Sequence, residues 1–102
     1  MPMEKLKAHY LLPEIQGLVL RDGVRSFTFT AMRGAESMGL SRAEAVGVVL
    51  ALTASMLYKS MTTSSDNKVW QDVYHTPCPN GKIAYIKLTV QDGAVVIQFK
   101  ET

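Results

Sequence analysis

The chain has 102 residues, of which 47% are hydrophobic and 20% charged, a composition typical of one folded domain and unlike that of a disordered chain. Its net charge of +2 is too small to indicate nucleic-acid binding by itself. The single cysteine excludes an internal disulfide, no apolar run reaches the ~20 residues of a bilayer span, and the N-terminus lacks a secretory signal. We therefore expect residues 1–102 to form one cytoplasmic domain with no membrane role.

The chain begins with a polar arm and a first helix. Residues 1–10 are expected to be loosely ordered. Residues 12–21 carry apolar side chains at three-to-four spacing, Pro13 fits the first turn of a helix, and Asp22 with the following glycine forms a stop signal. This pattern predicts a helix that serves packing.

A short strand and a second helix are predicted next. Residues 24–27 are a candidate strand, and Thr28 or Thr30 can cap a helix that runs to about Ser37. Residues 27–30 also alternate as a strand does, so both structures remain open for them.

A capping box opens the third predicted helix. Ser41 and Glu44 have the required spacing, and the apolar residues 45–52 follow them. Because this helix is apolar nearly all round, we expect it to lie under a sheet. The period then changes to two, and turn residues separate four strand-like segments: 57–63, 69–74, 82–90 and 94–100.

Helices followed by a meander of strands indicate an α+β fold, with an antiparallel sheet of about four to six strands packed on two or three N-terminal helices. One face of the sheet is then free for function. Alternation in the last two strands predicts an inward set of Ala84, Ile86, Leu88, Val90, Val95, Ile97 and Phe99. The predicted outward set is Tyr85, Lys87, Thr89, Gln98 and Lys100.

The earlier strands are harder to orient. Lys59 falls in one set with Met61 and Thr63, while Gln71 falls opposite Trp70 and Asp72. An error of one residue in register would exchange their faces.

Four motifs in the second half have the residues and the order found in one known family. They are Tyr58-Lys59-Ser60-Met61-Thr62-Thr63, Trp70-Gln71-Asp72-Val73-Tyr74, Ala84-Tyr85-Ile86-Lys87 and Phe99-Lys100-Glu101. The chain resembles the MqsR family of toxins, small endoribonucleases with a RelE/YoeB-like microbial ribonuclease fold. The resemblance implies that the catalytic residues are Lys59, Gln71, Tyr85 and Lys100. We expect further contacts with RNA from Lys87, Gln98, Thr62 and Tyr74.

The resemblance also implies a function and partners. The chain would be the toxin of a type II toxin-antitoxin pair, a metal-independent, sequence-selective endoribonuclease that cuts single-stranded mRNA near GC-containing triplets and stops translation and growth, with no cofactor. An MqsA-like antitoxin with zinc-binding and helix-turn-helix parts would bind it, and promoter DNA would be reached only through that antitoxin. The alternatives are a catalytically silent RNA-binding or co-repressor module and an unrelated interaction domain.

Metal-free RNA cleavage requires a proton acceptor for the 2′-hydroxyl, donors that stabilise the charge on phosphorus, and a proton for the departing 5′-oxygen. Lys59, Tyr85 or Lys100 could be acid or base, and the sequence leaves these roles open, since a lysine base needs a lowered pKa.

Several residues have simpler explanations. Lys87 and Lys100 could be solvated charges, core packing is favoured for Trp70, and Tyr74 is open between packing and base stacking. His75 and Cys78 have the spacing of a metal pair but lack further ligands, so no metal is expected.

Overall fold

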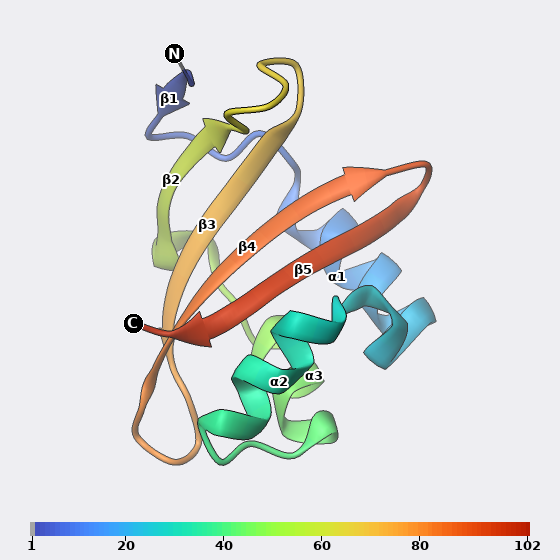
Figure 1. Cartoon of the computed structure of the whole chain (residues 1–102), viewed down its shortest axis with the longest axis vertical. Helices are drawn as coiled ribbons and strands as arrows, with labels where there is room; N and C mark the ends of the chain where they lie inside the picture. Colours follow the sequence, from blue (N-terminus) through green and yellow to red (C-terminus); the bar gives the residue numbers. More distant parts are fainter. Residues whose placement is uncertain (1) are drawn as a thin grey trace.

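The computed structural model describes residues 2–102 and confirms the α+β fold (Figure 1). Within that range, five strands form one antiparallel sheet in the order β1-β2-β3-β4-β5. The strands are β1 (Glu4–Lys5), β2 (Leu57–Thr62), β3 (Trp70–Pro77), β4 (Ile83–Gln91) and β5 (Ala94–Glu101). The helices are α1 (Leu12–Asp22), α2 (Phe29–Ser37) and α3 (Arg42–Leu50). None of these helices has the length and apolarity needed to cross a membrane.

The second and third helices begin at the predicted caps. The Oγ1 of Thr28 accepts a hydrogen bond from the backbone N–H of Ala31 at 3.0 Å. Ser41 and Glu44 form the complete capping box, with N···O distances of 3.1 and 2.8 Å. Each cap satisfies backbone donors that the first helical turn leaves free.

Residues 24–27 do not form the predicted strand. They belong mainly to a 3₁₀ turn, Gly23–Ser26, that links α1 to α2, and Phe27 makes one isolated parallel bridge to Ile97. The backbone N–H of Phe27 donates to Val24 within this turn at 3.0 Å. Because the backbone of residues 23–26 is hydrogen-bonded within the turn, only Phe27 is left to pair with the sheet.

Helix α2 lies along the free edge of β5. A methyl group on Gly34 would overlap the carbonyl oxygen of Phe99, so glycine is what allows the helix to approach the strand this closely. The backbone N–H of Thr28 also donates to the carbonyl of Ile97 at 3.2 Å. The helix thereby covers an edge that would otherwise be open to pairing with another chain.

Helix α3 packs chiefly against α1, α2 and the 3₁₀ turn, which corrects the prediction that it lies under the sheet. Ala45, Val48 and Val49 are buried, but Ala43 and Gly47 are exposed although they carry no polar group. Small residues without polar groups made the sequence of this helix apolar on all sides, although other elements cover only one of its faces.

The core lies between the helices and one face of the sheet. The predicted inward residues are buried there, apart from half-buried Val90, and α1 contributes Leu12, Ile15 and Val19 to the same cluster. The opposite face, which is turned toward the viewer in Figure 1, is not covered by any helix of residues 2–102. We call it the open face.

The N-terminal arm is held against the sheet by backbone pairing and side-chain bonds, which corrects the prediction that residues 1–10 are loosely ordered; Met1 lies outside the described residues. The buried carboxylate of Asp72 accepts hydrogen bonds from the backbone N–H groups of His9 and Tyr10 at 3.0 and 2.9 Å and from the Ser60 hydroxyl at 2.6 Å. Charge-assisted bonds of this kind are stronger than neutral ones, so Asp72 fixes the arm to the sheet.

Trp70 is half-buried beneath this arm and is not part of the core cluster, contrary to the favoured prediction. The His9 ring stacks on it with centroids 5.1 Å apart, and the Lys5 ammonium lies 4.2 Å from the indole centroid.

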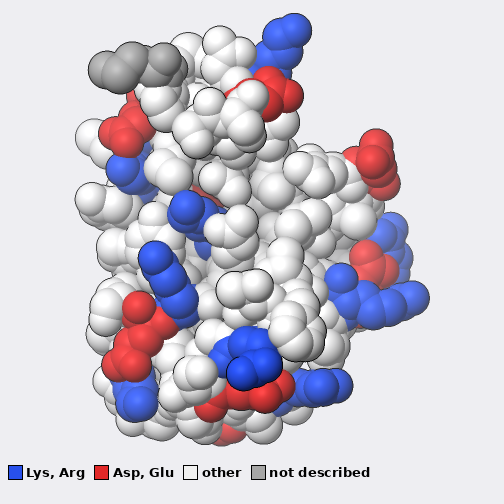
Figure 2. Space-filling model, viewed as in Figure 1, with Lys and Arg blue, Asp and Glu red and all other residues white. Residues whose placement is uncertain are grey.

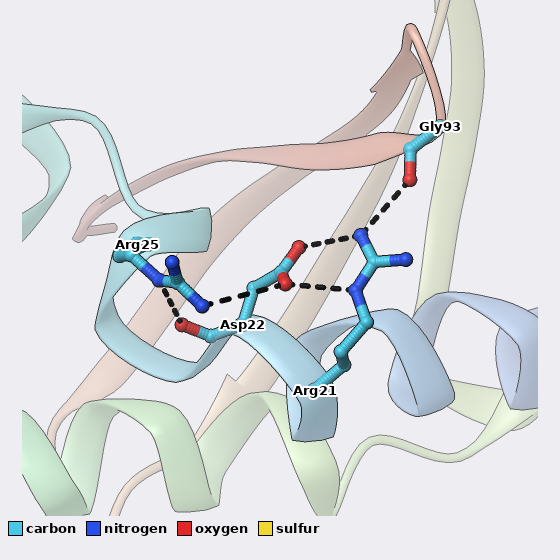
Figure 3. A network of polar contacts seen from close by, with 4 residues as sticks. All are labelled: Arg21, Asp22, Arg25 and Gly93. Atoms are coloured by element: carbon cyan, nitrogen blue, oxygen red, sulfur yellow. Dashed lines mark hydrogen bonds and ion pairs between the residues drawn. The ribbon is translucent and has the colours of Figure 1, made fainter.

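A polar network fixes the end of α1 to the turn between β4 and β5 (Figure 3). Arg21 binds Asp22 at 2.8 Å and donates to the carbonyl of Gly93 at 3.1 Å, while Arg25 lies 3.9 Å from Asp22. The Arg21 hydrogen bond lowers the pKa of Asp22. Because the groups are at the surface, the network orients the hairpin more than it stabilises the fold.

Candidate active site

The register of the sheet brings the outward residues of β3, β4 and β5 into rows on the open face. Tyr85 lies between His75 on β3 and Lys100 on β5, and Lys87 pairs with Gln98. Figure 2 shows basic side chains over the middle of this face and acidic ones mainly toward its margins. The predicted outward set is therefore correct for these four residues of β4 and β5.

A β-bulge between Leu57 and Lys59 extends these rows across β2. A bulge changes the direction of neighbouring side chains, and here both Tyr58 and Lys59 reach the open face. The Tyr58 ring stacks on His75 with centroids 4.5 Å apart, and Lys59 pairs with Val73, the neighbour of Lys87.

Two adjoining hollows follow the open face. The first, of about 390 Å³, lies between the start of α2 and the last two strands; the second, of about 340 Å³, lies toward the N-terminal arm. Residues of the first include Thr28, Thr30, Tyr85 and Lys100; those of the second include Glu4, Met61 and Gln71; Lys87 and Gln98 line both. We call the two hollows together the sheet groove.

The electrostatics of the groove favour an anion. Burial lowers the pKa of Lys87, and the nearby Lys100 and Lys59 lower it further. The Lys100 ammonium is 5.1 Å from the centroid of the Tyr85 ring. Ammonium groups that repel one another in the free protein are positioned to bind a phosphate, which would relieve that repulsion.

Lys59 has a different environment. Its ammonium donates a hydrogen bond to Glu4 at 2.7 Å, and this bond raises the pKa of Lys59. A lysine held protonated in this way can donate a proton or stabilise negative charge, but it is a poor base at neutral pH.

Tyr74 does not reach the groove surface, which corrects its prediction as an RNA-binding residue, whereas Thr62 is among the residues that line the second hollow. Tyr74 is 1% exposed and lies in the core, where burial raises the pKa of its phenol. Thr62 is also 1% exposed, and its hydroxyl accepts a hydrogen bond from the backbone of Met3 at 2.8 Å. Thr89 is buried as well, because Tyr10 of the arm lies against it.

The sequence did not reveal three residues that border the candidate site: Glu4, Tyr58 and His75. Glu4 arrives through the N-terminal arm, and Tyr58 through the bulge. The His75 ring lies between Tyr58 and Tyr85, and its Nε2 is buried without a hydrogen-bond partner among residues 2–102. The alternation of aromatic residues and histidine on neighbouring strands was the available signal for this stack.

The described residues offer no evident metal centre. In residues 2–102, no group of three or more His, Cys, Asp or Glu side chains could hold a metal ion. Cys78 is buried, and burial raises the pKa of its thiol.

Comparison with known proteins gives matches that cover most of the chain. A family described as "Motility quorum-sensing regulator, toxin of MqsA" matches residues 7–101. The chain is also 38% identical over 99 residues to the protein named mRNA interferase toxin MqsR from Escherichia coli (strain K12), and the aligned region covers 97% of this chain and 99% of that relative.

Proposed function

The chain belongs to the MqsR toxin family, and on that premise we propose that the open face of its sheet is the surface that cuts RNA. The chain is a toxin and an endoribonuclease of the mRNA interferase class. We assign catalysis to Lys59, Gln71, Tyr85 and Lys100, and RNA binding to Lys87 and Gln98. The observation that carries this assignment is that the register brings all six side chains to one face, around one cationic groove.

The reaction that this surface fits is attack by the RNA's own 2′-hydroxyl. The hydroxyl loses its proton and its oxygen forms a bond to phosphorus; the bond from phosphorus to the 5′-oxygen breaks, and the leaving oxygen takes a proton. The products are a 2′,3′-cyclic phosphate and a 5′-hydroxyl. No metal enters these steps.

The residues divide naturally among these tasks. Lys59, Lys87 and the amide of Gln71 stabilise the extra charge on the phosphate oxygens, because donors fixed before the charge develops need no reorganisation. Lys100 and Tyr85 lie together at the far end of the groove, and one of them gives the proton to the leaving oxygen.

The substrate is mRNA, and the partner is an antitoxin of the MqsA kind. Within the proposal, one toxin domain acts on single-stranded segments in the cytoplasm with a preference near GC-containing triplets. The resemblance in sequence further suggests an antitoxin that binds zinc and reaches promoter DNA through a helix-turn-helix part, so that the toxin affects transcription only through it.

Cleavage of an end-labelled single-stranded RNA that contains all triplets, in EDTA, tests the assignment. We expect discrete cuts by the unmutated protein and a fall of about 100-fold or more for Lys59→Ala, Lys100→Ala and Gln71→Ala, since one positioned group typically contributes that much. Lys68→Ala, in the exposed turn between β2 and β3, is the matched control and should cut normally.

Two results would refute the proposal. Undiminished cutting by the three folded variants would remove these residues from catalysis. RNA that is bound but left intact by the folded, unmutated protein would favour the silent RNA-binding alternative.

A further inference from the structure

The sheet groove is rich in proton donors and poor in proton acceptors. The lysines that line it are Lys87 and Lys100. Lys59, on β2, donates a hydrogen bond to Glu4, and this bond raises the pKa of Lys59. Among residues 2–102, Glu4 supplies the one carboxylate that lines either hollow. Cleavage through a 2′-hydroxyl nevertheless requires a base.

The position of Glu4 is fixed by backbone pairing. Glu4 lies opposite Met61 in the β1–β2 pair, and Met3 and Thr62 exchange two hydrogen bonds, from Met3 N to Thr62 Oγ1 at 2.8 Å and from Thr62 N to Met3 O at 2.9 Å. The bonds from His9 and Tyr10 to Asp72 secure the other end of the arm. Groups that are positioned in advance are the ones that contribute most to catalysis.

The Glu4 carboxylate is both oriented and accessible. One oxygen, Oε1, accepts the hydrogen bond of Lys59 at 2.7 Å, yet the side chain is 57% exposed, against 23% for Lys59. A substrate hydroxyl can therefore approach the carboxylate without displacing the lysine.

The charged groups that face Glu4 come from two strands. Lys59 of β2 is bound to it, and Lys87 of β4 lines the same hollow. Lys5, on Glu4's own strand, lies over Trp70, on the other side of the sheet. A phosphate held by Lys59 and Lys87 would place the adjacent ribose beside the carboxylate.

Two other groups near the site are less suitable as the base. Burial lowers the pKa of Lys87, but Lys87 lines both hollows as a phosphate-binding cation and serves there in its charged form. His75 lies outside both hollows, its ring is enclosed by Tyr58 and Tyr85, and its Nε2 is buried.

We propose that Glu4 is the general base of the cleavage reaction, an inference that rests on the proposed function. Its carboxylate takes the proton of the 2′-hydroxyl as the oxygen attacks phosphorus, and the resulting carboxylic acid returns the proton to solvent after the 5′-oxygen has left with a proton from Lys100 or Tyr85. In this arrangement Lys59 orients the Glu4 carboxylate through their hydrogen bond and also binds the phosphate.

The decisive variant is Glu4→Gln, because the amide oxygen can still accept the hydrogen bond of Lys59 while the basic carboxylate is lost. We expect kcat to fall about 100-fold or more, with KM little changed and the acidic limb of the pH–rate profile abolished. Glu4→Asp, which keeps a carboxylate, should recover part of the rate and the acidic limb. Glu14→Gln, with the same charge change on exposed α1, should cut as the unmutated protein does.

The opposite outcomes are clear. A Glu4→Gln protein that cuts at the normal rate, or that keeps the acidic limb, would overturn the assignment. One that cuts faster would mean that the carboxylate competes with the substrate phosphate for Lys59, which also overturns it. If the unmutated protein cuts no RNA, the proposed function itself fails, and the Glu4 assignment fails with it.

Discussion

Two glycines in helices should respond to the same substitution in opposite ways. Gly34 in α2 faces the backbone of β5, and an added methyl group would overlap the carbonyl oxygen of Phe99. Gly47 in α3 has no atom within 4 Å of the position that such a methyl group would take. Alanine is intrinsically the better helix former at both positions.

The magnitudes decide the sign of each effect. Replacing glycine by alanine within a helix stabilises by about 1 kcal/mol. Overpacking costs about 1–3 kcal/mol, and the obstacle at Gly34 is a backbone carbonyl that cannot rotate away, so the upper end applies. We expect Gly34→Ala to lower the free energy of unfolding by about 2 kcal/mol and Gly47→Ala to raise it by about 1 kcal/mol.

Urea unfolding followed by circular dichroism measures both changes. Gly34→Ala should also cut RNA more slowly, because moving α2 away from β5 displaces Thr28 and Thr30, which line the sheet groove. Stabilisation of Gly34→Ala equal to that of Gly47→Ala would refute the close packing of α2 on β5.

Other substitutions test the arm, the groove and a cap. Asp72→Ala should lower the free energy of unfolding in urea by about 4 kcal/mol, because the buried Ser60 hydroxyl and two backbone donors of the arm lose their partner. Asp66→Ala, in an exposed turn, should lower it by less than about 1 kcal/mol. Similar losses in the two variants would contradict the role of Asp72. The pKa of Lys87 is lowered in the folded protein, so its charged form destabilises the fold at neutral pH and this cost disappears as the pH rises toward 10.5. Lys87→Met should therefore be more stable than the unmutated protein at pH 7 and should bind RNA less well. Its advantage in free energy of unfolding should disappear near pH 10.5. An advantage that does not change with pH would exclude the charge of Lys87 as its cause. Thr28→Ala should lower the free energy of unfolding by about 1 kcal/mol, because the hydrogen bond that caps α2 is lost. An unchanged midpoint of urea unfolding would contradict this role of Thr28.

Much of the fold could be predicted because its signals are local. The capping box of Ser41 and Glu44 joins residues three apart, and the alternation in β4 and β5 is unambiguous since every second residue is apolar. The course of the N-terminal arm was missed because its partner, Asp72, lies about sixty residues away in the sequence. Propensity cannot indicate a contact of that range.

The candidate site was predictable only in part, for the same reason. The outward positions of Lys87, Gln98, Tyr85 and Lys100 follow from alternation alone, whereas their roles in catalysis and binding came from the resemblance. In β3, the inward-facing Asp72 is polar, and it is stable there because backbone groups of the arm donate hydrogen bonds to its carboxylate. This polar residue interrupted the apolar alternation that would have placed Tyr74 on the buried face. Glu4 reaches the groove because β1 pairs with β2, which lies far along the chain in the sequence.

Replacement of one ribonucleotide by its 2′-deoxy form, immediately 5′ of a mapped cut, is the most direct test of cleavage by the RNA's own hydroxyl. With the unmutated protein in EDTA, we expect that cut to vanish while neighbouring cuts in the same RNA persist. Cutting that continues at the same phosphate would show that another nucleophile attacks it, and would contradict the assignment of the open face to this reaction.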